Sequence, residues 1–318
     1  MRSMLSVSGG WTLPVVLAAM LACAASSAGA GDASGVPGAF ADIGIGARAV
    51  GLGGSVVAVD GAESLFWNPA RLDPGGHSGE AHVSYCDQMG LVPYSTAAGT
   101  MRLGGYTVGA GVLYSGDDVL TETTILLGAS RPLPELSWCE ERSPQVGAAA
   151  RVRRASFGNN EAHEGQVTGT ATGFALDVGA TAPLPGGADV GVVWRDALST
   201  LSWDSSAGGT YDEPVPSVIA LGVAMTAADR LTVEVGLDTS LEEDGRDIAS
   251  IGAELVLFEI AALRGGYRTS INDDTYDEFV AGGGVSTMLG TATAGVDVAY
   301  VFGQLDDTLR MALTVGWK

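Results

Sequence analysis

Apolar and polar residues alternate along most of the chain after residue 75, and this pattern limits the fold more than any other feature. In residues 231–238, 291–300 and 308–317 every second residue is apolar. Successive side chains of a strand point to opposite faces, so each run predicts a strand with one apolar face. Similar runs begin near residues 80, 92, 104, 121, 144, 172, 188, 216, 230, 247, 260, 277, 290 and 307, which gives about fourteen strands of the length that a transmembrane barrel needs.

The connections between these runs alternate as well. Short or Gly- and Pro-bearing connections fall at residues 103–105, 183–187, 226–229, 258–259 and 288–290. Longer, mostly acidic connections fall at residues 157–170, 199–214, 240–247, 270–277 and 303–307. Residues 131–143 are the exception, because a short turn is due there. An up-and-down membrane barrel sorts its loops in this way, whereas a soluble sandwich, the alternative for alternating strands, has no reason to.

A bilayer offers no water to unpaired amides, so exported strands with apolar outer faces must close into a ring. We therefore expect an all-β, antiparallel, up-and-down transmembrane barrel over residues 76–318, in contact with outer-membrane lipid of a diderm bacterium. Aromatic residues on the apolar phase would form interfacial girdles, with ordinary core packing as the alternative: Tyr106, Tyr114, Trp194, Tyr267, Tyr300 and Trp317.

Residues 1–30 have the pattern of a cleaved export signal. Arg2 precedes an apolar run over residues 13–25, which is too short to span a membrane, and residues 28–30 offer a small-x-small cleavage site. A lipoprotein cut before Cys23 is the alternative. Export leaves Cys86 and Cys139 in an oxidising compartment. Counting strands puts these two residues at opposite ends of the wall, so we expect two free thiols.

Charge and motifs exclude several classes of function. The net charge is −21 and Lys318 is the only lysine, which excludes nucleic acid as a partner, a P-loop and Schiff-base chemistry. No common catalytic motif occurs, so we expect no enzyme, no catalytic residue and no cofactor. A serine–histidine site with His82 as base is the remaining alternative. Acidic loops at residues 242–244 and 273–274 lack a calcium-loop pattern, so we expect solvated loops and no metal site.

The polar phase of the strands carries charges of both signs, and in a barrel this phase faces the lumen. Its members are Arg151, Arg153, Arg195, Arg264, Arg268 and Arg310 together with Asp177, Glu234, Glu254 and Asp297. Burial of one sign alone is costly, so we expect pairing across the lumen and onto the segment that precedes the barrel. A structural network is the favoured interpretation, and a selectivity lining for a solute is the alternative.

Residues 40–72, FADIGIGARAVGLGGSVVAVDGAESLFWNPARL, join a Gly-rich start to a WNPA motif. This stretch resembles the N-terminal signature of PorV/PorQ-type outer-membrane proteins, relatives of the FadL transporters. The later stretches PSVIALGVAM, DRLTVEVGLD, LRGGYRTS and VDVAYVFGQLDDTLRMALTVGW resemble the wall of the same barrels. Such barrels usually end on an aromatic residue, whereas here Lys318 follows Trp317.

The resemblance implies that residues 31–75 fold inward as a hatch, with a Gly-rich segment of a soluble β-protein as the alternative. The residues that would form it are Arg48, Gly51, Gly53, Gly54, Phe66, Trp67, Asn68 and Pro69. A barrel of this size is too wide for its wall side chains to fill, so an inserted segment is expected on physical grounds too. Arg48 would pair with a lumen carboxylate such as Glu234 or Asp297.

The resemblance implies two functions. PorV-type members are accessories of type IX protein secretion, whose partners are secretion-machinery proteins and exported cargo. FadL-type members are passive channels for hydrophobic small molecules. The likeness to PorV/PorQ is the closer of the two, so the sequence favours the secretion accessory and keeps the hydrophobic-solute channel as the alternative.

Overall fold

The computed structural model describes residues 44–88, 90–117, 119–134, 142–158, 167–242, 245–272, 276–303 and 307–318. The strands are β1 (Gly79–Gln88), β2 (Val92–Leu103), β3 (Tyr106–Gly116), β4 (Leu120–Pro132), β5 (Gln145–Phe157), β6 (Gly169–Pro183), β7 (Ala188–Ser205), β8 (Gly209–Asp212), β9 (Val218–Ala227), β10 (Leu231–Ser240), β11 (Ile248–Leu257), β12 (Ala261–Ser270), β13 (Asp277–Leu289), β14 (Ala292–Phe302) and β15 (Thr308–Trp317). The predicted signal peptide, residues 1–30, lies outside the described residues.

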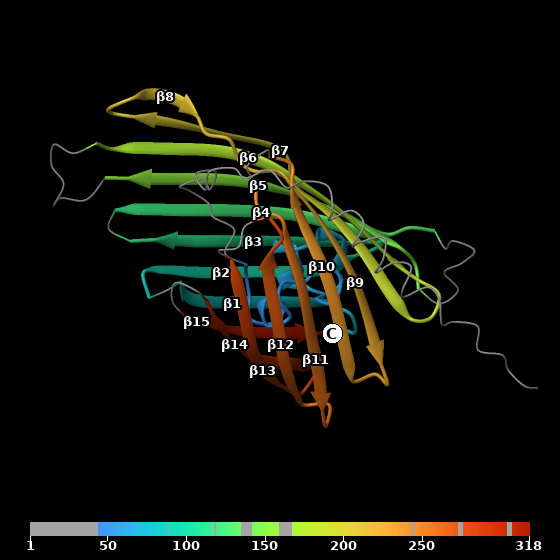
Figure 1. The fold of residues 1–318 in the computed structure, drawn as a ribbon. Helices are drawn as coiled ribbons and strands as arrows, with labels where there is room; N and C mark the ends of the chain where they lie inside the picture. Colours follow the sequence, from blue (N-terminus) through green and yellow to red (C-terminus); the bar gives the residue numbers. More distant parts are fainter. Residues whose placement is uncertain are drawn as a thin grey trace, which may run out of the picture.

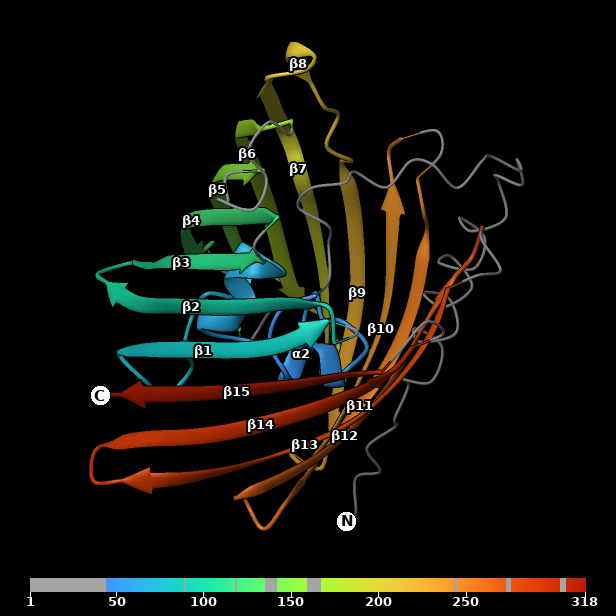
Figure 2. The same ribbon diagram turned by 90° about the vertical axis from the view of Figure 1, so that its left-hand side faces the viewer.

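Fourteen of these strands form a closed antiparallel barrel, which confirms the predicted fold class (Figures 1 and 2). Each strand pairs with its neighbours in chain order, and β1 pairs with β15 to close the ring. The short β8 is the exception, because it pairs only with the far end of β7 and stands beside the ring. In Figure 2 the N-terminal segment, in blue, lies within the space that the strands surround.

The strands begin where the alternating pattern places them. All fourteen predicted starts lie within three residues of an observed start. The expected loop at residues 199–214 is wrong: β7 continues to Ser205 and folds back as β8. Leu201 and Trp203 explain this extension, because they point to the inner face and pack against Ala155 and Ala171 of the neighbouring strands.

The two faces of the wall differ as the alternation requires. On β10, Val233 is 36% exposed on the outside, whereas Glu234 is 2% exposed on the inside. Aromatic side chains are exposed on the outer face near both ends of the strands, among them Tyr106 and Trp317 at one end and Tyr114 and Tyr300 at the other. No helix in the described part of the chain is long and apolar enough to cross a membrane.

The described part of the connections keeps the predicted order of short and long loops. Residues 103–106 and 289–292 turn with two residues between paired strand ends, and Gly104 and Gly290 supply the positive φ that such a turn needs. We call this end of the barrel, where β15 also ends, the short-turn end. Parts of the acidic loops at residues 242–244 and 273–274 lie outside the described residues. Cys86 is buried and free, while Cys139 lies outside the described residues.

Candidate functional site inside the barrel

The N-terminal segment, residues 44–72, contains three short helical turns: α2 (Arg48–Gly51), η1 (Ala62–Phe66) and η2 (Pro69–Arg71). Its apolar side chains, Leu52, Leu65 and Trp67 among them, form one buried cluster with inward residues of the wall such as Leu126 and Val280. Such helices are too short to be stable alone, so contacts with the wall determine the shape of the segment.

Glycines of the wall let the segment approach closely. Gly252 on β11 and Gly266 on β12 are paired in register, and a Cβ on Gly252 would lie 2.0 Å from the carbonyl oxygen of Leu52. Gly147 on β5 and Gly179 on β6 form a second pair in register, and a Cβ on Gly179 would lie 2.0 Å from Oδ1 of Asn68. Backbone contact of this kind requires residues without side chains.

The WNPA motif shapes the segment from within. Asn68 caps η2, because its Oδ1 accepts a hydrogen bond from the Ala70 amide at 3.0 Å, and its Nδ2 donates to the Val56 carbonyl at 2.9 Å. The Trp67 indole donates to the Ile45 carbonyl at 2.9 Å. Pro69 at the first position of η2 needs no amide partner there. The hydrogen bonds to the Ile45 and Val56 carbonyls link the motif to earlier parts of the segment.

The carboxylate of Glu234 on β10 holds the segment by its backbone. Oε1 accepts hydrogen bonds from the amides of Val56 at 2.7 Å and Val57 at 2.9 Å. Oε2 accepts from the Ala58 amide at 2.9 Å and from the Ser55 hydroxyl at 2.7 Å. Three consecutive amides thus converge on one buried carboxylate, an arrangement that stabilises negative charge without a cation.

Arg48 forms the second polar link to the wall. Its guanidinium donates to both carboxylate oxygens of Glu254 on β11, at 2.9 and 3.0 Å. Arg264 on β12 bridges Glu254 and Asp297, at 2.6 Å to each. Burial lowers the pKa of Arg48, but the charge and hydrogen bonds of Glu254, together with the charges of Glu63 and Asp60, raise it above the usual value. The sequence suggested that Arg48 pairs with Glu234 or Asp297, and this is wrong. Backbone amides of the segment occupy the Glu234 carboxylate, and Arg264 occupies that of Asp297.

The remaining predicted lumen charges form pairs within the wall. The ion pairs are Arg151–Asp177 at 2.5 Å, Arg153–Asp196 at 2.7 Å, Arg195–Asp238 at 2.5 Å and Arg268–Glu278 at 3.5 Å. Arg310 instead donates to the Gly44 carbonyl at 2.8 Å and so reaches the segment. A structural network and a selectivity lining for a solute would both place these residues on the inner face. The role of the residues therefore stays a prediction.

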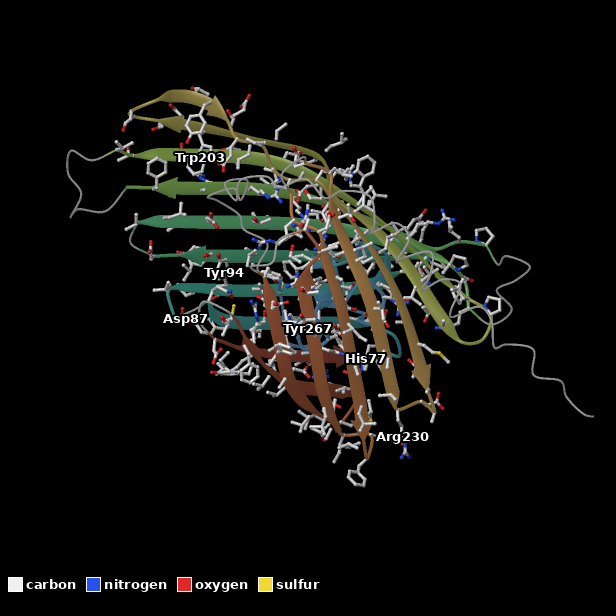
Figure 3. All side chains as sticks on the ribbon, in the orientation of Figure 1. His77, Asp87, Tyr94, Trp203, Arg230 and Tyr267 are labelled. Atoms are coloured by element: carbon white, nitrogen blue, oxygen red, sulfur yellow. The ribbon has the colours of Figure 1, made fainter. Side chains whose placement is uncertain are left out.

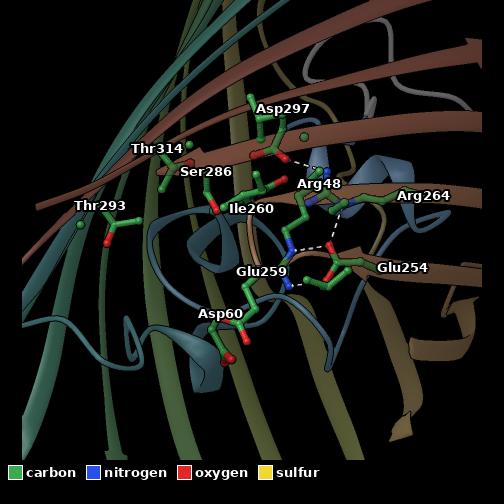
Figure 4. A pocket seen from close by; sticks show the side chains of 18 of the residues that line it. Arg48, Asp60, Glu254, Glu259, Ile260, Arg264, Ser286, Thr293, Asp297 and Thr314 are labelled. Carbon is green, nitrogen blue, oxygen red and sulfur yellow. Dashed lines mark hydrogen bonds and ion pairs between the residues drawn. The ribbon is translucent and has the colours of Figure 1, made fainter. Parts of the chain in front are cut away.

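A polar cavity of about 290 Å³ lies between the segment and strands β11 to β15 (Figure 4). It lies toward the short-turn end, since Glu259 and Ile260 of the β11–β12 turn line it. Six carboxylates and two arginines border it. Among them is Glu63, which is 5% exposed and accepts a hydrogen bond from the Ala49 amide at 2.9 Å. Burial raises the pKa of Glu63 to about 7.

Several contact residues were missed by sequence reasoning. Glu63, Ser55 and the four paired wall glycines were not singled out as site residues. An acidic residue among small and apolar ones was the available signal for Glu63. The glycine pairs become visible only once the strand register is known. His82, considered as a base, contacts Thr314 through Nδ1 at 3.0 Å.

No protein-family profile matches the sequence, and no curated protein matches it. Solved structures do match. A monoaromatic hydrocarbon channel, CymD, is 16% identical with a TM-score of 0.59, and the match covers 88% of this chain and 99% of CymD. The Pseudomonas putida toluene transporter TodX is 15% identical with a TM-score of 0.55, over 86% of this chain and 98% of TodX. The chain has a FadL-like fold.

A FadL homologue of Pseudomonas aeruginosa gives a similar result, at 11% identity and a TM-score of 0.55, over 84% of this chain and 96% of that one. At such identities the likeness concerns the FadL-like fold alone. It supports the broader part of the resemblance found in the sequence and says nothing specific of PorV or PorQ. Residues 31–43 lie outside the described part, so a hatch spanning residues 31–75 stays a prediction.

Proposed function

We propose that this protein is an outer-membrane channel for small hydrophobic solutes, and that its N-terminal segment closes the lumen in the state described here. The observation that carries the proposal is the barrel with a segment fixed to its inner wall, in a fold shared with channels for hydrocarbons. Those solved structures are transport channels, which favours transport over catalysis.

The far end of the barrel supports an apolar solute. Leu201 and Trp203 on the extended β7 point inward, and Trp203 is labelled in Figure 3. The Trp203 ring lies 5.5 Å from that of Phe157 and 6.4 Å from that of Tyr211. This apolar cluster lies at the opposite end of the strands from the short turns. An aromatic solute arriving from that side would meet aromatic and aliphatic side chains before it reaches the polar anchors of the segment.

The exposed outer face supports placement in a membrane. Leu127, Val152, Phe174 and Val285 are among the apolar side chains that are about half exposed on the outside of the wall. A soluble protein rarely exposes so much contiguous apolar surface. Outer-membrane placement also agrees with the channels that share the fold. The secretion-accessory role, which the sequence favoured, receives no support from these comparisons.

The test is uptake of toluene by cells that carry the protein in their outer membrane and otherwise admit toluene slowly. We expect the initial uptake rate to rise above that of cells with an empty vector, while entry of a small sugar stays unchanged. Equal toluene uptake in the two strains, with the barrel shown to be folded by heat-modifiable migration, would contradict the proposal.

A further inference from the structure

Two arginines of the strands lie on the outer face: Arg131 on β4, whose guanidinium lies over the Tyr106 ring, and Arg154 on β5. Arg154 on β5 follows Arg153, which is 3% exposed on the inner face, so Arg154 lies on the outer face, where it is exposed. Within the described part of the chain its guanidinium makes no hydrogen bond or ion pair. An unpaired cation on the lipid side of a membrane barrel needs a physical explanation.

Hydroxyl groups surround Arg154 on the same face. Thr123 on β4 and Thr172 on β6 are directly opposite it in register, and cross-strand neighbours of this kind have Cβ atoms about 5 Å apart. One step farther from the short-turn end, Thr121, Ser156 and Thr170 form the next outward row. Thr121 and Ser156 share a hydrogen bond of 2.8 Å between their hydroxyls. Arg154 therefore lies in a cluster of five hydroxyl-bearing side chains.

The register also gives the level of this cluster relative to the apolar surface. The next row toward the short-turn end consists of Ile125, Val152 and Phe174, which are 49%, 50% and 47% exposed. Across β3, the row of Arg154 continues to Tyr114, an aromatic of the interface type. Arg154 thus lies where the apolar band ends. An outward arginine costs about 2–4 kcal/mol at the bilayer midplane but close to nothing at the interface.

We propose that Arg154 and the adjacent hydroxyls bind the phosphate group of an anionic lipid in the leaflet on the far side from the short turns. A guanidinium matches a phosphate with two parallel hydrogen bonds, and Thr123 and Thr172 can donate further ones. The chain carries a net charge of −21, so a bare cation on its lipid face is a local exception. Asp204, opposite Thr170 in register, bounds the cluster on one side.

This inference requires the membrane placement but not the passage of any solute. A protein that transports nothing could still hold such a lipid, so toluene uptake and lipid binding can fail separately. The matched control is Arg230, an exposed arginine in the β9–β10 turn at the opposite end of the molecule (Figure 3).

The experiment is native mass spectrometry of the detergent-purified full chain, titrated with phosphatidic acid or with a neutral glycolipid of the same acyl chains. We expect Arg154→Gln to weaken phosphatidic acid binding about tenfold, as loss of a charge-assisted hydrogen bond would. Arg154→Lys should be intermediate, and Arg230→Gln should bind as the original chain does. The neutral glycolipid should bind all four proteins alike.

Two results would overturn the inference. One is equal phosphatidic acid binding by Arg154→Gln and the original chain. The other is displacement of the lipid by an equal concentration of inorganic phosphate, because the site would then recognise free phosphate. Should Arg154→Gln fail to fold, as judged by heat-modifiable migration, Thr172→Val replaces it and is expected to show a smaller loss of the same lipid.

Discussion

Glu234 and Glu254 lie on the inner faces of neighbouring strands, and each fixes the N-terminal segment with different chemistry. Glu234 accepts hydrogen bonds from three consecutive amides and a hydroxyl, with no arginine involved. Glu254 is bound by the guanidinium groups of Arg48 and Arg264. The first contact depends on the shape of the backbone, whereas the second depends on two long side chains with several rotatable bonds. A carboxylate bound by amides therefore requires one conformation of the segment, and a carboxylate bound by arginines tolerates several.

Removal of residues 36–70 is the largest change that bears on this comparison. If both glutamates serve to hold a segment that closes the lumen, the deletion should leave a wide pore, because a barrel of this strand number exceeds what its own side chains can fill. Single-channel conductance in planar bilayers should rise strongly above that of the full chain. Unchanged conductance in a correctly folded barrel would show that the segment does not close it.

Glu234→Ala should have the next largest effect. The buried amides of Val56 and Val57 would lose their acceptor, whereas the Ala58 amide keeps the Ser55 hydroxyl at 3.0 Å. Each unsatisfied donor costs about 1–3 kcal/mol. We expect the docked state of the segment to lose about 3–5 kcal/mol, and the protection of amides 55–58 from hydrogen exchange to fall accordingly. The barrel strands should keep their protection. Val233→Ala on the outer face is the control, since it touches no part of the segment.

Glu254→Gln should have a smaller effect, of about 2 kcal/mol on docking. Arg264 keeps Asp297 as a partner, and the Arg48 side chain is 35% exposed and can be solvated. The double variant with Arg48→Gln should cost less than the sum of the two single changes, because the two residues are in contact. Hydrogen exchange of amides 48–58 would provide the free energies. An additive result would mean that the ion pair does not hold the segment.

The comparison also shows what the sequence could predict. Alternation is a local signal repeated in every strand, so the strand starts and the closed barrel followed from it. The β7–β8 extension was missed because residues 204–213 have the composition of a loop, with acidic residues, serine and glycine. The residues of the lumen phase could be named, but their partners could not. Arg48 and Glu254 are 206 residues apart in sequence, and no local pattern links them.

Glu234 illustrates the limit further. Its partners are backbone amides, which every residue except proline carries, so side-chain chemistry gave no reason to choose them. The segment was singled out because the WNPA motif resembles a known family signature, and its role as a hatch stays a prediction. The paired wall glycines, such as Gly147 with Gly179, required the strand register. The local alternation therefore predicted the strands of the wall. The site could not be predicted in the same way, because it depends on contacts between distant parts of the chain.

Glu63 adds a predicted dependence on pH. Burial raises its pKa to about 7 in the docked segment, from about 4.5 when the segment is solvated. The docked state therefore binds a proton more readily than the released state does. The contribution of Glu63 to docking is complete below about pH 4.5 and is lost as the pH rises toward 7.

The docked segment should consequently open less often at pH 5 than at pH 8, by up to about 1.4 kcal/mol per pH unit within this window. The frequency of channel opening in planar bilayers at the two pH values measures this difference. Glu63→Gln carries no titrating proton at this position, so its opening frequency should change much less with pH. Arg48 and the Ala49 amide favour the charged form of Glu63, and Asp297 opposes it. If Glu63→Gln kept the full pH response, another titrating group would have to cause it. The carboxylates that hold the segment, Glu234 bound by amides and Glu254 bound by arginines, would then be the next groups to test.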